Sequence, residues 1–171
     1  MAETNNLAVQ AVQSAQATKI KGKDLMLFIT TNGVTKALAL VTNTTLSITA
    51  NTNEYKTKDD TSESNPEITS VSWEATSESM YAVEAGQDAQ MTANEVIKAM
   101  LAKTLIGVAI AETSQSGKDV SVPTGGWKQK DASFTMSGNG YITSFQLTAS
   151  NEDYATVSIT ITGKGPLNTL A

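Results

Sequence analysis

The side chains that could carry chemistry in this chain are carboxylates, lysines and hydroxyls. Its 171 residues include no cysteine, no histidine and no arginine. This composition excludes disulfides, Cys/His zinc sites, Ser-His or Cys-His catalysis and bidentate arginine clamps on phosphate. Any reaction centre would have to be built from acids, lysine, Ser/Thr or Tyr alone.

The acidic residues do not form a recognisable site. Glu74 and Glu78 fall on the same face of one expected strand. At the usual rise they lie about 13–14 Å apart, further than the carboxyl pair of a glycoside hydrolase. The acidic run at residues 59–63 offers oxygen ligands for Ca²⁺ but lacks the alternating Asp-x-Asn/Asp-Gly spacing of a calcium loop. The sequence therefore predicts no catalytic residues, no metal site and no enzyme.

Signals for phosphate binding are equally weak. Gly-Lys occurs three times, yet no pair has the second glycine five positions earlier or the following Ser/Thr that a phosphate-binding loop needs. Twelve lysines against 17 acids give a net charge of −5. Because phosphate contacts dominate affinity for nucleic acids, a mildly acidic surface without arginine disfavours a protein that grips DNA or RNA.

The elements that must carry these side chains are mostly strands. Threonine (25 residues) and serine (16) are abundant, and alternating polar and apolar positions recur at residues 44–51, 68–81 and in the last third of the chain. Asn32-Gly33 predicts a two-residue hairpin between residues 25–31 and 34–42. Together these patterns predict a mainly β fold, either a β-sandwich or an open barrel.

One helix is expected to pack on the sheet. Thr92 and Glu95 have the spacing of a capping box, and an apolar stripe follows, so the helix should span about residues 93–103. Residues 1–20 are expected to form an N-terminal arm, and residues 21–171 the patterned domain. Nothing at the N-terminus has the pattern of a secretory signal, which indicates synthesis in a cytoplasm without export.

Two polar regions stand out as candidate functional surfaces. Residues 52–66 contain one apolar side chain, Tyr55, and are expected to form a long hairpin extension or a loop that protrudes from the body. The second region consists of the uncharged or acidic positions that alternate with apolar ones in two expected strands. Its members are Thr45, Ser47, Thr49, Ser70, Ser72, Glu74 and Thr76.

The order of these segments resembles the major tail tube proteins of long-tailed bacteriophages with non-contractile, siphovirus-type tails. The similarity covers roughly residues 22–167 and depends on the order and spacing of several short stretches. These are Gly22-Lys23-Asp24-Leu25-Met26-Leu27-Phe28, Thr44-Thr45-Leu46-Ser47-Ile48, Thr57-Lys58-Asp59, Trp73-Glu74-Ala75 with Tyr81, Tyr141-Ile142-Thr143-Ser144, Ala155-Thr156-Val157-Ser158-Ile159 and Gly163-Lys164-Gly165-Pro166-Leu167.

The resemblance implies a structural virion protein of the phage tail, non-enzymatic and without a cofactor. Subunits of this family form hexameric rings that stack into a tube for DNA ejection, and they meet a tape-measure protein and terminator or baseplate proteins. By this resemblance the polar strand positions line the lumen, and the long loop reaches the next ring. Its candidate stacking residues are Glu54, Tyr55, Lys56, Lys58, Asp59, Asp60 and Glu63.

The main alternative is a monomeric β-sandwich binding module of the adhesin or carbohydrate-binding type. Such a module normally has an export route and a clustered aromatic platform, and neither is evident in this sequence. An enzyme that uses Glu74 with an acid from another strand is a third hypothesis. The size of the particle separates the first two, because a binding module stays a monomer of 18.0 kDa whereas a tube subunit forms rings or filaments.

Overall fold

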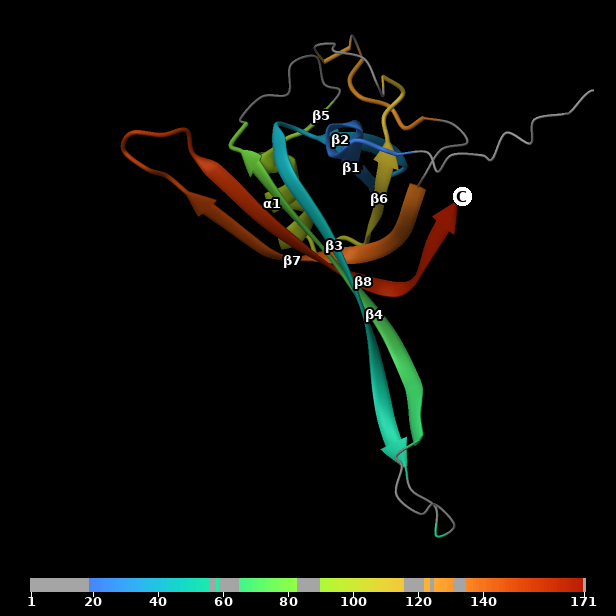
Figure 1. Cartoon of the computed structure of the whole chain (residues 1–171). Coiled ribbons are helices and arrows are strands. Elements are labelled where there is room, and N and C mark those ends of the chain that lie inside the picture. The colour runs from blue at the N-terminus through green and yellow to red at the C-terminus, as the bar shows by residue number, and fades with distance from the viewer. Residues whose placement is uncertain are drawn as a thin grey trace, which may run out of the picture.

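One continuous sheet holds all the strands of the described chain. The computed structural model describes residues 19–55, 58, 65–82, 90–115, 122–123, 125–130 and 135–170. Within these ranges eight strands follow the order β3-β4-β8-β7-β6-β1-β2-β5. The predicted mainly β class with one helix is confirmed, and the open-barrel form of that prediction is the one that applies, because the strands share a single coiled sheet (Figure 1).

The sheet combines short strands with long ones. A 3₁₀ turn, η1 (Gly22–Asp24), precedes β1 (Leu25–Thr31), and one helix, α1, spans Ala93–Leu101. The other strands are β2 (Val34–Leu38), β3 (Val41–Tyr55), β4 (Asn65–Met80), β5 (Gln90–Met91), β6 (Ile106–Glu112), β7 (Thr135–Thr148) and β8 (Thr156–Leu170). β2 and β5 pair in parallel, and the other paired strands are antiparallel. Within the described ranges no helix is long and apolar enough to cross a membrane.

The β1–β2 hairpin and the helix begin where the sequence predicts. Asn32 and Gly33 adopt positive φ angles of 51° and 78°, the conformation that a two-residue turn between twisted strands requires. Thr92 and Glu95 form the complete capping box. The helix ends at Leu101, slightly before the predicted end near residue 103, and Lys103 takes a positive φ of 53°.

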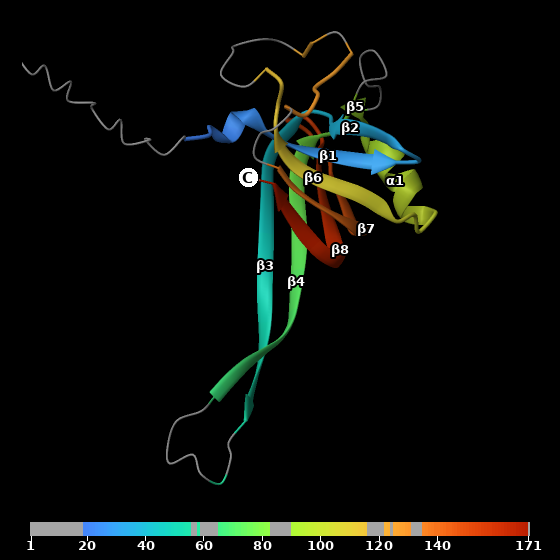
Figure 2. The ribbon, with the colours of Figure 1, turned by 90° about the vertical axis from the view of Figure 1, so that its right-hand side faces the viewer.

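The hydrophobic core fills the inside of the coiled sheet and is closed by α1. Val96 of the helix is fully buried there with Leu27, Ile106 and Ile161. In Figure 2 the helix lies at the right of the coiled sheet, and the β3 edge lies at its left. A smaller cluster around Phe28 covers the other face of β1, with Trp127 packed against it. The two apolar faces of β1 are thus both covered.

Gly138, Asn139 and Gly140 have residue types that are typical of turns, yet they lie inside β7. The glycines serve close packing instead. A Cβ atom at Gly138 or Gly163 would overlap the ring of Trp73, and one at Gly140 would overlap the backbone of β8. The absence of side chains therefore lets the Trp73 indole lie flat against β7 and β8.

A bulge at Thr143 also changes the predicted faces of β7. The register passes from Ile142↔Ile161 to Ser144↔Thr160, so Thr143 has no opposite residue. Simple alternation along the sequence would place Phe145 and Tyr141 on one face. In the structure Phe145 instead packs against the core together with Ile142.

The described ends of the polar segment at residues 52–66 form a two-stranded ribbon. β3 and β4 remain paired out to Tyr55↔Asn65, with a bulge near Asn51. β8 leaves β4 at Glu74↔Thr162, so the hairpin beyond this point has no third strand. We call residues 48–55 and 65–72 the projecting ribbon; it extends far below the rest of the molecule (Figures 1 and 2). The hairpin-extension alternative is therefore the correct one.

Candidate functional site

The polar residues singled out from the sequence share one face of the β3–β4 hairpin. The register pairs Thr45 with Thr76, Ser47 with Glu74 and Thr49 with Ser72, and Ser70 lies opposite Asn51. All seven are exposed except Thr76, which is half-buried. Alternation along each strand thus predicted which residues share a face. The register shows that these residues are also direct cross-strand neighbours.

The same polar face continues across the next two strands. On β8, Thr162 lies opposite Glu74, Thr160 opposite Thr76 and Ser158 opposite Glu78. On β7, Ser144 and Gln146 lie opposite Thr160 and Ser158. We call the outward side of β3, β4, β8 and β7 the polar face. Tyr141 lies opposite Thr162 and also belongs to this face, which simple alternation does not predict because the bulge at Thr143 interrupts it.

Many hydroxyl groups of the polar face bond to neighbours on the face itself. Thr143 Oγ1 and Thr162 Oγ1 lie 2.9 Å apart and share a hydrogen bond. Thr143 Oγ1 also donates to the Thr160 carbonyl at 3.3 Å. Further along the hairpin, Asn51 Nδ2 donates to Ser70 Oγ at 3.1 Å. These contacts hold short side chains against the sheet, so the side chains protrude little from the polar face.

The charges on the polar face are mostly negative. Glu74 and Glu78 lie on it, and Glu67 joins them opposite Asn53 in the projecting ribbon. Lys164, two residues after Thr162 on β8, is the one lysine that the described parts of these four strands contain. Its Nζ lies 5.5 Å from the centre of the Tyr141 ring and donates to the Tyr141 hydroxyl at 3.3 Å. The tyrosine therefore holds this single cation at one place on the face.

The predicted stacking residues belong to the far end of the projecting ribbon. Glu54 and Tyr55 are the last residues of β3 and are exposed, and Lys58 is exposed in the turn that follows. Tyr55 lies opposite Asn65, the first residue of β4. The remaining predicted residues lie outside the described residues. They are Lys56, Asp59, Asp60 and Glu63.

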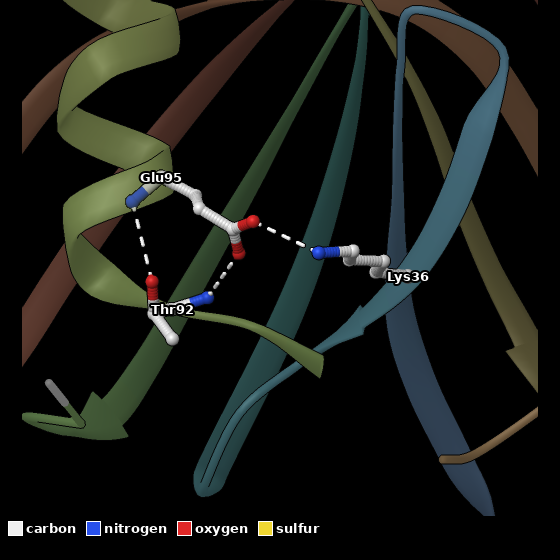
Figure 3. A network of polar contacts seen from close by, with 3 residues as sticks. All are labelled: Lys36, Thr92 and Glu95. Atoms are coloured by element: carbon white, nitrogen blue, oxygen red, sulfur yellow. Dashed lines mark hydrogen bonds and ion pairs between the residues drawn. The ribbon is translucent and has the colours of Figure 1, made fainter. Parts of the chain in front are cut away.

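One polar network connects the helix to the sheet (Figure 3). Glu95 accepts hydrogen bonds from Lys36 Nζ at 2.8 Å and from the Thr92 backbone N–H at 2.9 Å. Partial burial raises the pKa of Glu95, but these two donors and the Lys36 charge outweigh it and leave the pKa below its ordinary value. Because this carboxylate caps α1 and holds β2, its role is structural.

The described residues offer no centre for metal chemistry: no three acidic residues among them lie close enough together to hold an ion. What the geometry does provide is an extended surface of hydroxyls and carboxylates across four strands. The family model for the phage tail tube protein matches residues 19–169. The chain belongs to the phage tail tube protein family. It is a structural protein of the virion tail, a tail tube subunit.

Solved structures of phage-like tails share the fold of this tail tube protein. The tail of an empty gene transfer agent particle, refined with helical C6 symmetry, has a TM-score of 0.65 at 14% identity and covers 88% of this chain and 98% of its own. The tail tube of SPP1 has a TM-score of 0.64 at 11% identity over 90% of this chain and 80% of its own.

A third similar fold occurs in the baseplate of the anti-feeding prophage. It has a TM-score of 0.61 at 10% identity and covers 91% of this chain and 98% of its own. No curated protein sequence matches this chain. At these sequence identities the similarity to the solved structures shows the fold alone. The family assignment comes from the match to the family model.

Proposed function

We propose that this tail tube protein assembles into hexameric rings that stack into a tube, with the polar face lining the channel through which DNA is ejected. The observation that carries the proposal is the continuous polar face across β3, β4, β8 and β7, on the opposite side from the core. The C6 symmetry of the gene transfer agent tail supports six subunits in a ring.

The two outer edges of this four-strand region support ring formation. β3 pairs with β4 alone, and its other edge has no paired strand among the described residues. On β7 the pairing with β6 ends at Gly140↔Ile106, so residues 141–148 pair with β8 alone. An open strand edge is a liability, and joining β3 of one copy to β7 of the next removes both edges by closing a barrel.

The chemistry of the polar face suits a channel that must not retain DNA. Phosphate contacts by lysine and arginine supply most of the affinity of nonspecific DNA binding. Three glutamates on this face repel phosphate, and Lys164 is turned to Tyr141. The proposal includes no catalysis and no cofactor. Before ejection the same channel would hold a tape-measure protein.

The far end of the projecting ribbon is proposed to contact the next ring. Glu54, Tyr55 and Lys58 lie there, beyond the part of the hairpin that β8 covers. Terminator and baseplate proteins would meet the same surfaces at the two ends of the tube. To test this contact, residues 56–64 can be replaced by Asn-Gly, which closes the hairpin between Tyr55 and Asn65 with a two-residue turn. The expected product is a folded subunit that fails to elongate.

Imaging of the purified protein tests the proposed assembly. Concentrated protein in salt that promotes association should form rings or tubes visible by negative-stain electron microscopy. Particles that stay at 18.0 kDa under all such conditions would contradict the proposal and would favour the monomeric binding module. Tubes formed by the Asn-Gly variant as readily as by the wild type would contradict the stacking role of the ribbon end alone.

A further inference from the structure

The projecting ribbon has an apolar side as well as a polar one. On the side opposite the polar face, Ile48, Val71 and Ile68 follow one another through the register pairs Ile48↔Trp73, Ala50↔Val71 and Thr52↔Ile68. We call these three residues the apolar stripe. They are 53%, 60% and 63% exposed, whereas Trp73, their neighbour on the same side, is 4% exposed. The stripe therefore continues the core beyond the point where the body covers it.

An uncovered stripe of this kind needs an explanation. Single exposed apolar residues are normal, but three β-branched residues in adjacent register on one side of a ribbon form a surface. A two-stranded ribbon is marginal in water without a third strand or a packed element. A bulge at Thr69 nevertheless brings Ile68 to the same side as Val71, which indicates a partner for this side.

The opposite end of the same hairpin presents a complementary surface. Leu40, which is 50% exposed, and Met80, which is 41% exposed, lie side by side there, because the Met80 N–H donates to the Leu40 carbonyl at 3.1 Å. Next to them a groove of about 440 Å³ separates β1 and β6 from the start of β3. Its apolar lining comes from Leu25, Met26, Val41 and Ile110. We call this surface, with Leu40 and Met80, the apolar groove.

We propose that the apolar stripe of one copy packs into the apolar groove of a second copy in the adjacent ring. The stripe and the groove are different surfaces at opposite ends of one hairpin, so their contact is head-to-tail. A head-to-tail contact that does not close on itself generates an open filament. This inference rests on the proposed function, in which the strand edges close the ring and leave the strand ends to meet the rings above and below.

This contact is hydrophobic and adds to the polar contact that is proposed at the end of the ribbon. The two differ in their response to salt. Sulfate strengthens the burial of apolar surface, whereas sodium chloride screens contacts between exposed charges. Tube elongation that depends on the stripe should therefore be promoted by ammonium sulfate and should tolerate sodium chloride.

The decisive variant is Val71→Thr with Ile68→Thr. Threonine keeps the branched β-carbon that favours strands, so the ribbon is retained while apolar area is lost. The matched control is Ser70→Thr with Ser72→Thr, which alters the same strand on its polar face. We expect the stripe variant to raise the protein concentration needed for tube growth by about tenfold or more, whereas the control should assemble like the wild type.

A second variant tests the groove. Leu40 has a positive φ of 50°, a conformation that asparagine adopts more readily than leucine. Leu40→Asn should therefore leave the fold intact and still hinder elongation. Circular dichroism and thermal unfolding of the unassembled subunits check that each variant is folded.

The outcomes distinguish a failure of the contact between stripe and groove from a failure of the proposed tube function. Tubes from the wild type, with rings or single subunits from the stripe and groove variants, would support the contact. If both variants elongate at the wild-type concentration, the stripe does not pack into the groove, and the proposed tube function is unaffected. If the wild type itself never assembles, the proposed function fails and this contact fails with it.

Discussion

The two halves of the β3–β4 hairpin each have a polar and an apolar side but very different surroundings. In the half within the body, Trp73 and Ala75 are buried beneath α1 and the coiled sheet. In the projecting ribbon, Val71 and Ile68 hold equivalent positions and are mostly exposed. The polar face runs along both halves without a break. The hairpin thus contributes to the core of the subunit at one end. At the other end we propose that it forms a contact between subunits.

The largest expected difference between the halves is in stability. Trp73→Ala removes a buried indole and its hydrogen bond from Nε1 to the Gly165 carbonyl at 3.1 Å. We expect a loss of about 3–5 kcal/mol in the free energy of unfolding, measured by urea denaturation of the unassembled subunit. Ile68→Ala is the matched change in the projecting ribbon and should cost less than about 1 kcal/mol. Equal losses in the free energy of unfolding would show that the two halves of the hairpin contribute equally to stability.

A smaller effect is expected from filling the space beside Trp73. Gly163→Ala places a methyl group against the indole ring, so the subunit should lose about 1–3 kcal/mol from overpacking. Gly22→Ala is the control, because no heavy atom lies within 4 Å of a Cβ at that position. Thermal unfolding of both variants measures the difference. A Gly163→Ala variant as stable as Gly22→Ala would mean that the glycine is not required for the packing of Trp73.

The sequence predicted the features that depend on local periodicity. The capping box at Thr92, the turn at Asn32 and the shared face of Ser47 and Glu74 each follow from neighbours a few residues away. The similarity to tail tube proteins predicted the family in the same way, from the order of short segments.

The features that sequence reasoning missed are set by distant contacts. Glycine often marks a turn, yet Gly138 lies inside a strand and close to Trp73, which lies 65 positions earlier in the chain. The sequence also left open whether the residues beyond position 52 pair as a hairpin extension or form a loop. The polar residues there have little strand propensity, and the backbone hydrogen bonds of the ribbon stabilise them in an extended form.

A third prediction concerns the charge of the polar face. Glu74→Lys should leave folding and assembly intact, because the side chain is exposed, and should slow DNA passage most at low salt, where screening is weakest. Glu152→Lys changes the net charge equally at an exposed position outside the four strands. The rate of genome ejection by phage particles with each variant measures the effect. Normal ejection by the Glu74→Lys phage at every ionic strength would exclude Glu74 from the channel wall.

The smallest expected effect is on acid stability and belongs to the body alone. Because the pKa of Glu95 is lowered in the folded state, its stabilising contribution is present above the ordinary value of 4.5 and is lost as the pH falls through the folded pKa. Its side chain is 40% exposed, so water screens the pair with Lys36 and the contribution is about 0.5 kcal/mol.

Glu95→Gln keeps a helix-capping side chain and removes the charge. We expect this variant to lose less stability than the wild type between pH 5 and pH 3, as measured by urea denaturation. Identical acid profiles for the two proteins would show that the ion pair with Lys36 contributes nothing.

The central claim is that the polar face lines the channel of a tube, and a helical reconstruction of assembled tubes by cryo-electron microscopy tests it most directly. We expect Glu74, Ser72 and Thr160 to point into the lumen and the projecting ribbon of each subunit to lie against the next ring. A map in which these side chains lie on the outer wall of the tube would contradict it.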